Sequence, residues 1–437
     1  MRKLDFNSDR QISACAILLA VGMFSGAAAI AQPAGYNYDE AKVPSYELPP
    51  VLTAGDGTSV ATPEQWQQQR RPEILSLFEQ HVFGKLPDRT SQLLIRQRSR
   101  VDNAFDGKAV RREITVYFSG DDSGPSMDML VYTPANADRP VPCFLGLNFN
   151  GNHTVDPDPA IHMTESWVRN DQQRGNIDHR ATEKSRGSSS SRWPAEMIVS
   201  GGYGLATIYY GDIDPDFDDG FRNGIHALTE GDRGDNKREP DAGGSISAWA
   251  WGLSHALDVL ITDPLVDGDR VAVFGHSRLG KTSLWAGATD PRFALVISNN
   301  SGCGGAALSR RRFGETVKRI NTSFPHWFCL NHRTYNDNED ALPVDHHMLM
   351  ALIAPRPVYV ASAVEDQWAD PRGELLSLYH ASPVYELLGK KGLPADELPE
   401  LNEPVQTDVG YHIRRGKHDV TDFDWQQYLK FADAHLR

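Results

Sequence analysis

One stretch of the chain joins an apolar, β-branched run to a tight glycine-bounded turn and then to a helical pattern, which limits the folds that the chain can adopt. Residues Val271 to Thr282 read VAVFGHSRLGKT. A serine on such a strand-to-helix turn, here Ser277, is pushed out of the sheet with its hydroxyl exposed. The turn departs from the usual G-x-S-x-G pattern, because Leu279 occupies the position of the second glycine and Gly280 follows it.

The same turn also fits a different class of protein. Residues Gly275 to Thr282 satisfy G-x-x-x-x-G-K-[ST], the phosphate-binding loop of nucleotide hydrolases, whose strand-loop-helix context is similar. The motif alone therefore does not separate a serine hydrolase from a nucleotide hydrolase, and the rest of the chain has to decide.

Length and charge set the first bounds. The 437 residues include 40% hydrophobic residues, enough to bury a sizeable core in one large or two ordinary domains. No linker, charge block or internal repeat is visible, so we expect a single domain over residues 32–437, with 32–125 as an N-terminal wrap and antiparallel entry strands. A formal charge of −14 argues against binding to nucleic acid or to anionic membranes.

The first residues have the layout of a cleaved secretory signal, which we place at 1–31. Basic residues near the start precede an apolar stretch from Ile12 to Ile30, and small residues lead up to Ala31. No later run reaches the roughly 18 apolar residues of a membrane helix, so we expect a secreted or periplasmic protein without a membrane partner. Of the cysteines that remain, Cys303 and Cys329 could pair, and the sequence leaves this open.

Strand and helix patterns alternate from Val141 onward, which is typical of βαβ units and a parallel sheet. We therefore predict an α/β fold with a doubly wound, mostly parallel sheet in a three-layer α/β/α sandwich, whose ligands bind beyond the carboxyl ends of the strands. A helix is expected to begin after Thr62, with Pro63 in its first position. The other predicted helices are Ala248–Thr262 and Asp424–Leu436, and the predicted strands are Gln92–Arg98, Val110–Phe118, Met127–Thr133, Val141–Asn148, Leu205–Tyr209, Val271–Phe274, Leu295–Ser298 and Val358–Ala363.

The order of polar residues after these strands favours a serine hydrolase with the α/β-hydrolase fold. Such an enzyme has its nucleophile first, then an acid after a later strand, then a histidine near the C-terminus, and Ser277, Asp366 and His418 occur in that order. A nucleotide hydrolase would leave His418 without a role and would place its glycine loop on the first βα unit. An exported protein also meets little ATP. The acid is the least determined member, because Glu365 and Asp370 lie on the same loop as Asp366.

Seven segments of the chain resemble the bacterial glucuronoyl esterases of carbohydrate esterase family fifteen. They are GHSRLGK at 275–281, SGCGG at 301–305, FGE at 313–315, FPHW at 324–327, LPVD at 342–345, EDQWADP at 365–371 and GYHIRRGKH at 410–418. The resemblance spans most of the chain from about Trp66 to the C-terminus, in order and spacing. It implies hydrolysis of the ester that joins lignin alcohols to (4-O-methyl)glucuronate side groups of xylan, without a metal or organic cofactor.

The resemblance also assigns roles to single residues. It implies that Arg278 adds its guanidinium to the oxyanion site, that Lys281 and Glu315 bond sugar hydroxyls, and that Trp368 stacks on or borders the sugar. It selects His418 among the histidines. Some relatives carry a glutamate as the triad acid at the position of Asn300, but an amide cannot stabilise an imidazolium by charge, so Asp366 is favoured.

Other functions stay open at this point. An acetyl xylan esterase or another carbohydrate ester hydrolase would use the same triad, and a catalytically silent relative would only bind glycans. For Ser277 the simpler alternative is a helix N-cap, for Arg278 and Lys281 it is solvation at the surface, and for Trp368 it is core packing. The sequence does not give the alcohol preference or the need for the 4-O-methyl group, and a monomer is the default expectation.

Overall fold

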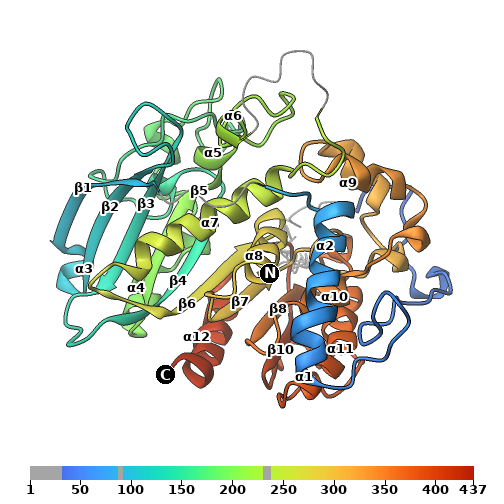
Figure 1. Ribbon diagram of the computed structural model, residues 1–437. Coiled ribbons are helices and arrows are strands. Elements are labelled where there is room, and N and C mark those ends of the chain that lie inside the picture. Colours follow the sequence, from blue (N-terminus) through green and yellow to red (C-terminus); the bar gives the residue numbers. More distant parts are fainter. Residues whose placement is uncertain (1–31, 87–91, 230–237) are drawn as a thin grey trace, which may run out of the picture. The chain divides into compact units, whose positions relative to one another are not determined.

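A twisted sheet of ten strands runs through the part of the chain that the structure describes, with strand order β1-β2-β3-β5-β4-β6-β7-β8-β10-β9 (Figure 1). The structure is a computed structural model that describes residues 32–86, 92–229 and 238–437. Residues Gly35–Arg437 cluster into one unit, and the predicted leader, 1–31, lies outside the described residues. The strands are β1 Leu94–Asn103, β2 Ala109–Tyr117, β3 Ser126–Pro134, β4 Val141–Asn148, β5 Gly204–Tyr209, β6 Val266–His276, β7 Leu295–Asn299, β8 Val358–Ala363, β9 Val405–Gln406 and β10 Val409–Arg414.

The sheet has an antiparallel beginning and a parallel centre. Strands β1, β2, β3 and β5 pair antiparallel, whereas β5, β4, β6, β7, β8 and β10 follow one another in parallel, and β9 closes the far edge antiparallel. The predicted α/β-hydrolase class with a mostly parallel sheet is therefore confirmed. All parallel strands direct their carboxyl ends to the same edge, where polar loops can meet.

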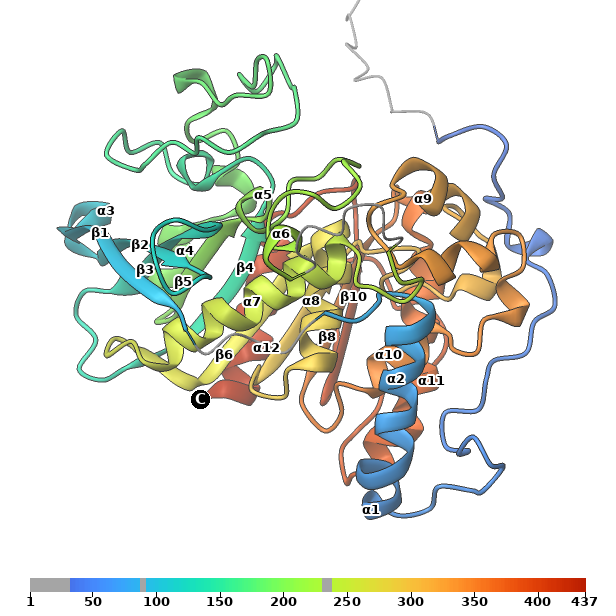
Figure 2. The ribbon, with the colours of Figure 1, turned by 45° about the horizontal axis from the view of Figure 1, so that its top comes forward.

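Helices cover both faces of this sheet (Figure 2). Alternate residues of β6 show the division, because Val271 and Val273 belong to one apolar core with α2, α7, α8, α10 and α11, whereas Ala272 and Phe274 belong to another with α4 and α12. The helices are α1 Pro63–Gln65, α2 Arg71–His81, α3 Ala104–Gly107, α4 Ala195–Ser200, α5 Tyr210–Ile213, α6 His226–Thr229, α7 Ser245–Ile261, α8 Arg278–Thr289, α9 Val317–Ser323, α10 His346–Ala351, α11 Pro371–Leu387 and α12 Asp422–Leu436.

The predicted elements agree with the observed ones at most positions. Strands β4 and β8 have the predicted bounds, and the helix after Thr62 begins with the expected cap, because the Thr62 side chain accepts from Gln65 N while the Gln65 side chain accepts from Thr62 N. Strands β9 and β10 and helices α10 and α11 were not predicted. Strand β10 is the important omission, because it leads to His418.

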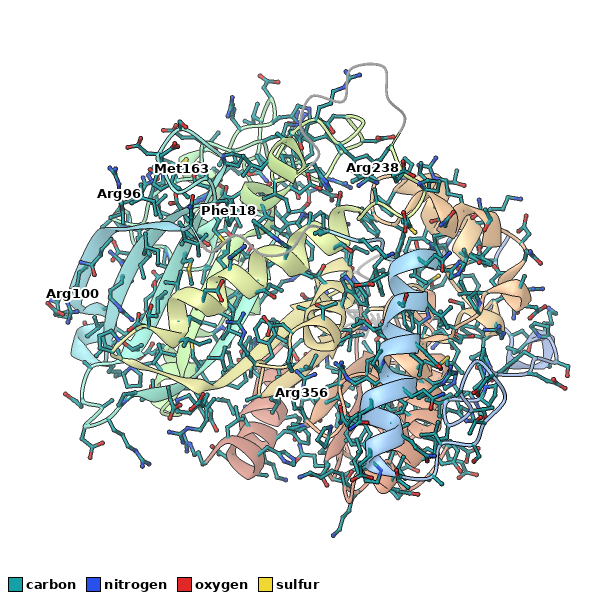
Figure 3. All side chains as sticks on the ribbon, in the orientation of Figure 1. Arg96, Arg100, Phe118, Met163, Arg238 and Arg356 are labelled. Carbon is teal, nitrogen blue, oxygen red and sulfur yellow. The ribbon has the colours of Figure 1, made fainter. Side chains whose placement is uncertain are left out.

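Some features away from the site bear on other expectations. Edge strand β1 carries the exposed side chains of Arg96, Arg98 and Arg100, of which Figure 3 labels the first and last, and charges of this kind discourage pairing with another sheet.

Cys143, Cys303 and Cys329 are buried free thiols, so Cys303 and Cys329 do not form the disulfide that the sequence left open. Among the described residues, none of the helices combines the length and the apolar character needed to cross a bilayer.

Candidate active site

Ser277 lies on the sharp turn between β6 and α8, in a backbone conformation that is rare for residues other than glycine. Its φ is 58° and its ψ is −127°. Such strain persists only where the surrounding structure enforces it, and here the Ser277 N–H donates to the Asn299 carbonyl at 2.8 Å. Ser277 occupies the N-cap position of α8, but its side chain makes no capping hydrogen bond, so capping does not account for a serine at this turn.

The two glycines around Ser277 explain the unusual motif. A Cβ on Gly275 would lie 1.8 Å from the Leu279 carbonyl oxygen, so no side chain fits there. A Cβ on Gly280 would lie 3.0 Å from both Ser298 Oγ and Ser301 Cβ, which is tight but less severe. The second glycine is therefore used where α8 packs against β7 and the loop after it, one position later than in the usual pattern.

Asp366 and His418, which are far apart in the sequence, meet at the carboxyl edge of the sheet. Nδ1 of His418 lies 2.6 Å from Oδ2 of Asp366, and the same oxygen accepts from Nδ2 of Asn300 at 2.8 Å. Asp366 is buried, whereas the His418 side chain is 41% exposed. A buried carboxylate on Nδ1 fixes the ring and directs its other nitrogen outward, as a general base requires.

Main-chain hydrogen bonds hold the two loops that carry this pair. Val364 N–H donates to the Arg414 carbonyl at 2.9 Å, and Glu365 N–H donates to the Gly416 carbonyl at 3.1 Å. The ring of His276, the residue before Ser277, lies 4.5 Å from the His418 ring between centroids. The His418 loop therefore lies against the turn that carries Ser277.

The other acids and histidines are engaged elsewhere. Asp370 pairs with buried Arg311 and caps α11 through Gly373 N, so it is a structural carboxylate. Among the histidines, His412 is buried, with Nε2 2.9 Å from Asp424. Glu365 is exposed on the same loop as Asp366. Of the three candidate acids, Asp366 is the one within hydrogen-bond distance of His418.

Arg278 follows Ser277 and points into a polar and aromatic pocket of side chains instead of solvent. Its guanidinium forms an ion pair with Asp216 and lies over the Trp327 ring at 4.7 Å and the Phe324 ring at 5.4 Å. The Arg278 side chain is 18% exposed. Solvation at the surface, the simpler alternative for this residue, is therefore wrong.

Asp216 anchors this arrangement and was not identified from the sequence. Its Oδ1 lies 2.7 Å from Trp327 Nε1 and 2.9 Å from His326 Nε2, and its Oδ2 accepts from Tyr210 OH at 2.9 Å as well as from Arg278. Burial, the largest single influence, would raise the pKa of Asp216, but the Arg278 charge together with the hydrogen bonds from His326 and Trp327 holds the pKa below its ordinary value. The one signal in the sequence was its place, soon after a predicted strand.

Lys281 is buried on the first turn of α8. Its Nζ donates to the Ser301 carbonyl, and burial lowers its pKa. Surface solvation is therefore wrong for Lys281 too. The lysine of a phosphate-binding loop reaches the phosphates of its nucleotide. Here the ammonium is buried against the Ser301 carbonyl, so the nucleotide-hydrolase interpretation of the motif does not fit this environment.

The turn that holds Lys281 depends on a second residue that sequence reasoning missed. Glu374, on α11, is fully buried, and its Oε1 accepts from Ser301 N at 2.7 Å and from Gly302 N at 2.9 Å. Its Oε2 accepts from Ser362 Oγ at 2.6 Å. Burial raises the pKa of Glu374 to about 8.

Glu315 and Trp368 lie side by side through their backbones. Glu315 N–H donates to the Trp368 carbonyl at 3.1 Å. Gly314 has φ 62°, and a Cβ there would lie 2.5 Å from the Trp368 carbonyl oxygen, so this close approach requires glycine. Burial raises the pKa of Glu315, while the charges of Lys281 and Arg278 act in the opposite direction. Trp368 is half-buried, which is not the environment of a core residue.

The arrangement can support acyl transfer by a serine nucleophile. Ser277 follows β6, Asn300 follows β7, Asp366 follows β8 and His418 follows β10, so the sheet gathers all four at one edge. Among the described residues, no group of three or more His, Cys, Asp or Glu side chains is arranged to hold a metal ion.

Comparisons with known proteins point to one family. Residues 238–389 match the family model described as "Glucuronyl esterase, fungi". The chain is 53% identical over 408 residues to carbohydrate esterase MZ0003 from an unknown prokaryotic organism, covering 93% of each. Among solved structures it is similar to a promiscuous CE15 esterase from a marine bacterial metagenome, with TM-score 0.86, 53% identity and coverage of 92% of this chain and 100% of that one. A glucuronoyl esterase from Solibacter usitatus gives TM-score 0.86, 50% identity and coverage of 91% and 100%.

Proposed function

Because this chain belongs to the glucuronoyl esterases of carbohydrate esterase family 15, we propose that it hydrolyses the ester between lignin alcohols and the (4-O-methyl)glucuronate groups of glucuronoxylan. Membership makes it a carboxylic ester hydrolase. The observation that carries the proposal is the hydrogen-bonded pair of buried Asp366 and partly exposed His418 beside the strained Ser277 turn. This pair would carry out the ester cleavage, and buried Lys281 and Glu315 next to it would bind the sugar acid.

In the proposed reaction, Ser277 Oγ attacks the ester carbonyl carbon while His418 takes the hydroxyl proton. The carbonyl electron pair moves onto the oxygen, and the Asp366 carboxylate stabilises the imidazolium. Collapse of this intermediate expels the alcohol, which receives the proton from His418. Water then attacks the acyl-enzyme with the same base, releasing glucuronic acid and restoring Ser277.

The developing oxyanion would meet two donors from one residue. The main-chain N–H of Arg278 opens α8 at the positive end of the helix, and the guanidinium of Arg278 is held nearby by Asp216. Donors that are fixed before the reaction stabilise the transition state without reorganisation. We assign Arg278 to the oxyanion site on this basis.

We assign recognition of the sugar to Lys281, Glu315 and Trp368. In a glucuronoyl ester the sugar is the acyl half, so its binding groups have to lie next to the oxyanion site. Lys281 is one helical turn from Ser277, and the charge of Lys281 acts on the pKa of Glu315. The lysine has donors besides the one that contacts Ser301.

We also propose that the protein is exported after removal of residues 1–31 and acts as a monomer on the plant cell wall. The composition of that segment supports the leader, and a polymeric extracellular substrate requires an enzyme outside the cytoplasm.

The test compares hydrolysis of a benzyl glucuronate ester with release of acetate from acetylated xylan. We expect the wild type to prefer the glucuronate ester and Ser277→Ala to lose turnover while keeping its fold, measured by circular dichroism. Lys281→Ala and Glu315→Gln should each lower kcat/KM on the glucuronate ester by about tenfold to a hundredfold, the effect of a charged hydrogen bond to a hydroxyl.

Two results would point to other functions. A wild type that prefers acetylated xylan would make the protein an acetyl xylan esterase, an alternative that deserves testing because one close relative is described as promiscuous. A wild type that cleaves neither substrate, and binds glucuronate equally well with and without Ser277, would be a glycan-binding relative.

A further inference from the structure

The segment Tyr36–Glu40 contacts the two loops that carry Glu315 and Trp368. We propose that this segment positions both loops and thereby determines the affinity of the enzyme for the acid half of its ester. The proposal rests on the proposed function for the roles of Glu315 and Trp368. It adds residues from the opposite end of the chain that the active-site motifs do not include.

The first contact is a main-chain hydrogen bond. Gly314 N–H donates to the Asn37 carbonyl at 2.8 Å. On its other side Gly314 lies so close to the Trp368 carbonyl oxygen that a Cβ on Gly314 would overlap it. The N–H of the next residue, Glu315, donates to this Trp368 carbonyl. The loop at Gly314 is therefore held between the N-terminal segment and the Trp368 loop.

Aromatic contacts add to this anchor. The Tyr36 and Trp368 rings meet edge to face at 4.9 Å between centroids, and Tyr38 approaches Phe313 in the same manner at 6.2 Å. Burial raises the pKa of Tyr38 to about 12, with smaller contributions from the charges of Tyr36 and Glu315.

A charged contact fixes the end of the segment. Glu40 Oε1 lies 2.6 Å from Arg311 Nη2, and the same guanidinium donates through Nε to Asp370 Oδ2 at 2.8 Å. Arg311 is buried, and it precedes the Gly314 loop, while Asp370 follows Trp368. One arginine thus ties the N-terminal segment to both loops.

These loops need such support because their backbones are strained. Arg312, Gly314 and Asp370 have φ values of 48°, 62° and 52°, in the left-handed region. Non-glycine residues remain in that region only when their surroundings hold them there. Loosening the N-terminal segment should therefore release Trp368 and Glu315 from the positions that face the sugar.

The decisive variant is Tyr36→Ala, because it removes the contact with Trp368 and leaves every catalytic residue in place. We expect its KM for a benzyl glucuronate ester to rise about twofold to tenfold, as when one side chain has to be ordered on binding, with kcat within about twofold of the wild type. Hydrolysis of p-nitrophenyl acetate, whose acyl group has no sugar, should not change. Tyr36→Phe keeps the ring and should restore the wild-type KM.

Two further variants make the result interpretable. Tyr117→Ala truncates a half-buried tyrosine on β2, far from these loops in the sheet order, and controls for a general loss of stability. Trp368→Ala tests the underlying assignment, and a wild-type KM in that variant would count against the proposed function itself. If Trp368→Ala raises KM while Tyr36→Ala does not, the inference about the N-terminal segment is wrong. Equal losses on both substrates in Tyr36→Ala would also overturn it.

Discussion

A single carboxylate oxygen, Oδ2 of Asp366, receives both the Asn300 amide and the His418 imidazole. Asn300 lies directly after β7. Here it supplies a hydrogen bond that orients the acid without adding a charge. The loop after β7 thus supports the carboxylate on the loop after β8.

Replacing Asp366 by asparagine tests this assignment. We expect Asp366→Asn to lower kcat by about 10³-fold to 10⁴-fold, because an amide neither stabilises the imidazolium nor keeps its tautomer. Glu365→Gln, one residue earlier and exposed, should keep most of the activity. Kinetics on a benzyl glucuronate ester separate the two, and a crippled Glu365→Gln beside an active Asp366→Asn would refute our choice of acid.

Asp216→Asn should weaken catalysis without contacting the substrate, since the amide cannot balance the Arg278 charge. We expect kcat to fall by about tenfold to a hundredfold on glucuronate and acetate esters alike, because both pass through an oxyanion. Breaking a buried pair also destabilises the fold, so assays belong well below the Tm. The control is Arg169→Ala. Arg169 also pairs with the Asp216 carboxylate, but its side chain is 52% exposed. An unchanged kcat in Asp216→Asn would show that Asp216 has no role in stabilising the oxyanion.

At the scale of elements, the β6–Ser277–α8 turn was predictable because residues next to one another in the sequence determine its geometry. The apolar run, the glycine and the serine are local signals, and the structure adds only the reason why Gly280 comes one position late. Strand β10 had no such signal. His412 and Arg414 interrupt its apolar pattern, and both are buried because Asp424 on α12 pairs with them at 2.9 and 2.8 Å. This pairing exists only once α12 has packed against β10, and a pattern of apolar residues does not describe it.

Gly275→Ala should destroy the turn, because the new Cβ would overlap the Leu279 carbonyl unless the backbone moves. We expect little folded protein and no activity in what can be purified. Gly280→Ala should be milder, since its closest contacts are at 3.0 Å. Gly55→Ala, where nothing lies within 4 Å of the new atom, is the matched control. A well-folded, active Gly275→Ala enzyme would be inconsistent with the observed turn.

For the molecule as a whole, the residues that we propose for catalysis were predicted more fully than the buried residues that hold them in place. Ser277, Asp366 and His418, the residues that we propose as the triad, follow strands in the expected chain order, but the family resemblance was needed to select His418 among the histidines and to favour Asp366 among the acids of its loop. Asp216 and Glu374 are recognised only by the donors that surround them, and those donors come from segments far away in the sequence. Burial of a carboxylate depends on the assembled fold, which composition and periodicity do not describe.

Glu374 gives the whole molecule a pH-dependent stability. Its pKa is about 8 in the folded protein against an ordinary value of 4.5 for glutamate, so the folded chain binds more protons than the unfolded chain between these two pH values. The contribution of Glu374 to the free energy of unfolding is complete below about pH 4.5 and is lost as the pH rises through about 8. Urea unfolding at about pH 5 and about pH 8 should show a decline in the wild type that is smaller in Glu374→Gln.

The control for that measurement is Glu386→Gln, on the exposed side of the same helix, which should keep the wild-type difference between the two pH values. Asp212, whose pKa burial raises to about 7, contributes with the same sign and leaves a residual slope in every variant. An identical decline in Glu374→Gln and the wild type would show that Glu374 is not protonated in the folded state.

The ion pair of Arg278 with Asp216 also affects how each reaction cycle ends. Hydrolysis turns a neutral ester into an anionic sugar acid, and an uncompensated guanidinium would retain that anion through a charge-assisted hydrogen bond. Asp216 cancels the charge locally, and the formal charge of −14 on the chain opposes an anion at longer range. We therefore expect free glucuronate to inhibit the wild type weakly and Asp216→Asn more strongly in competition assays. The carboxylate that orients the guanidinium thereby also favours release of the acid product.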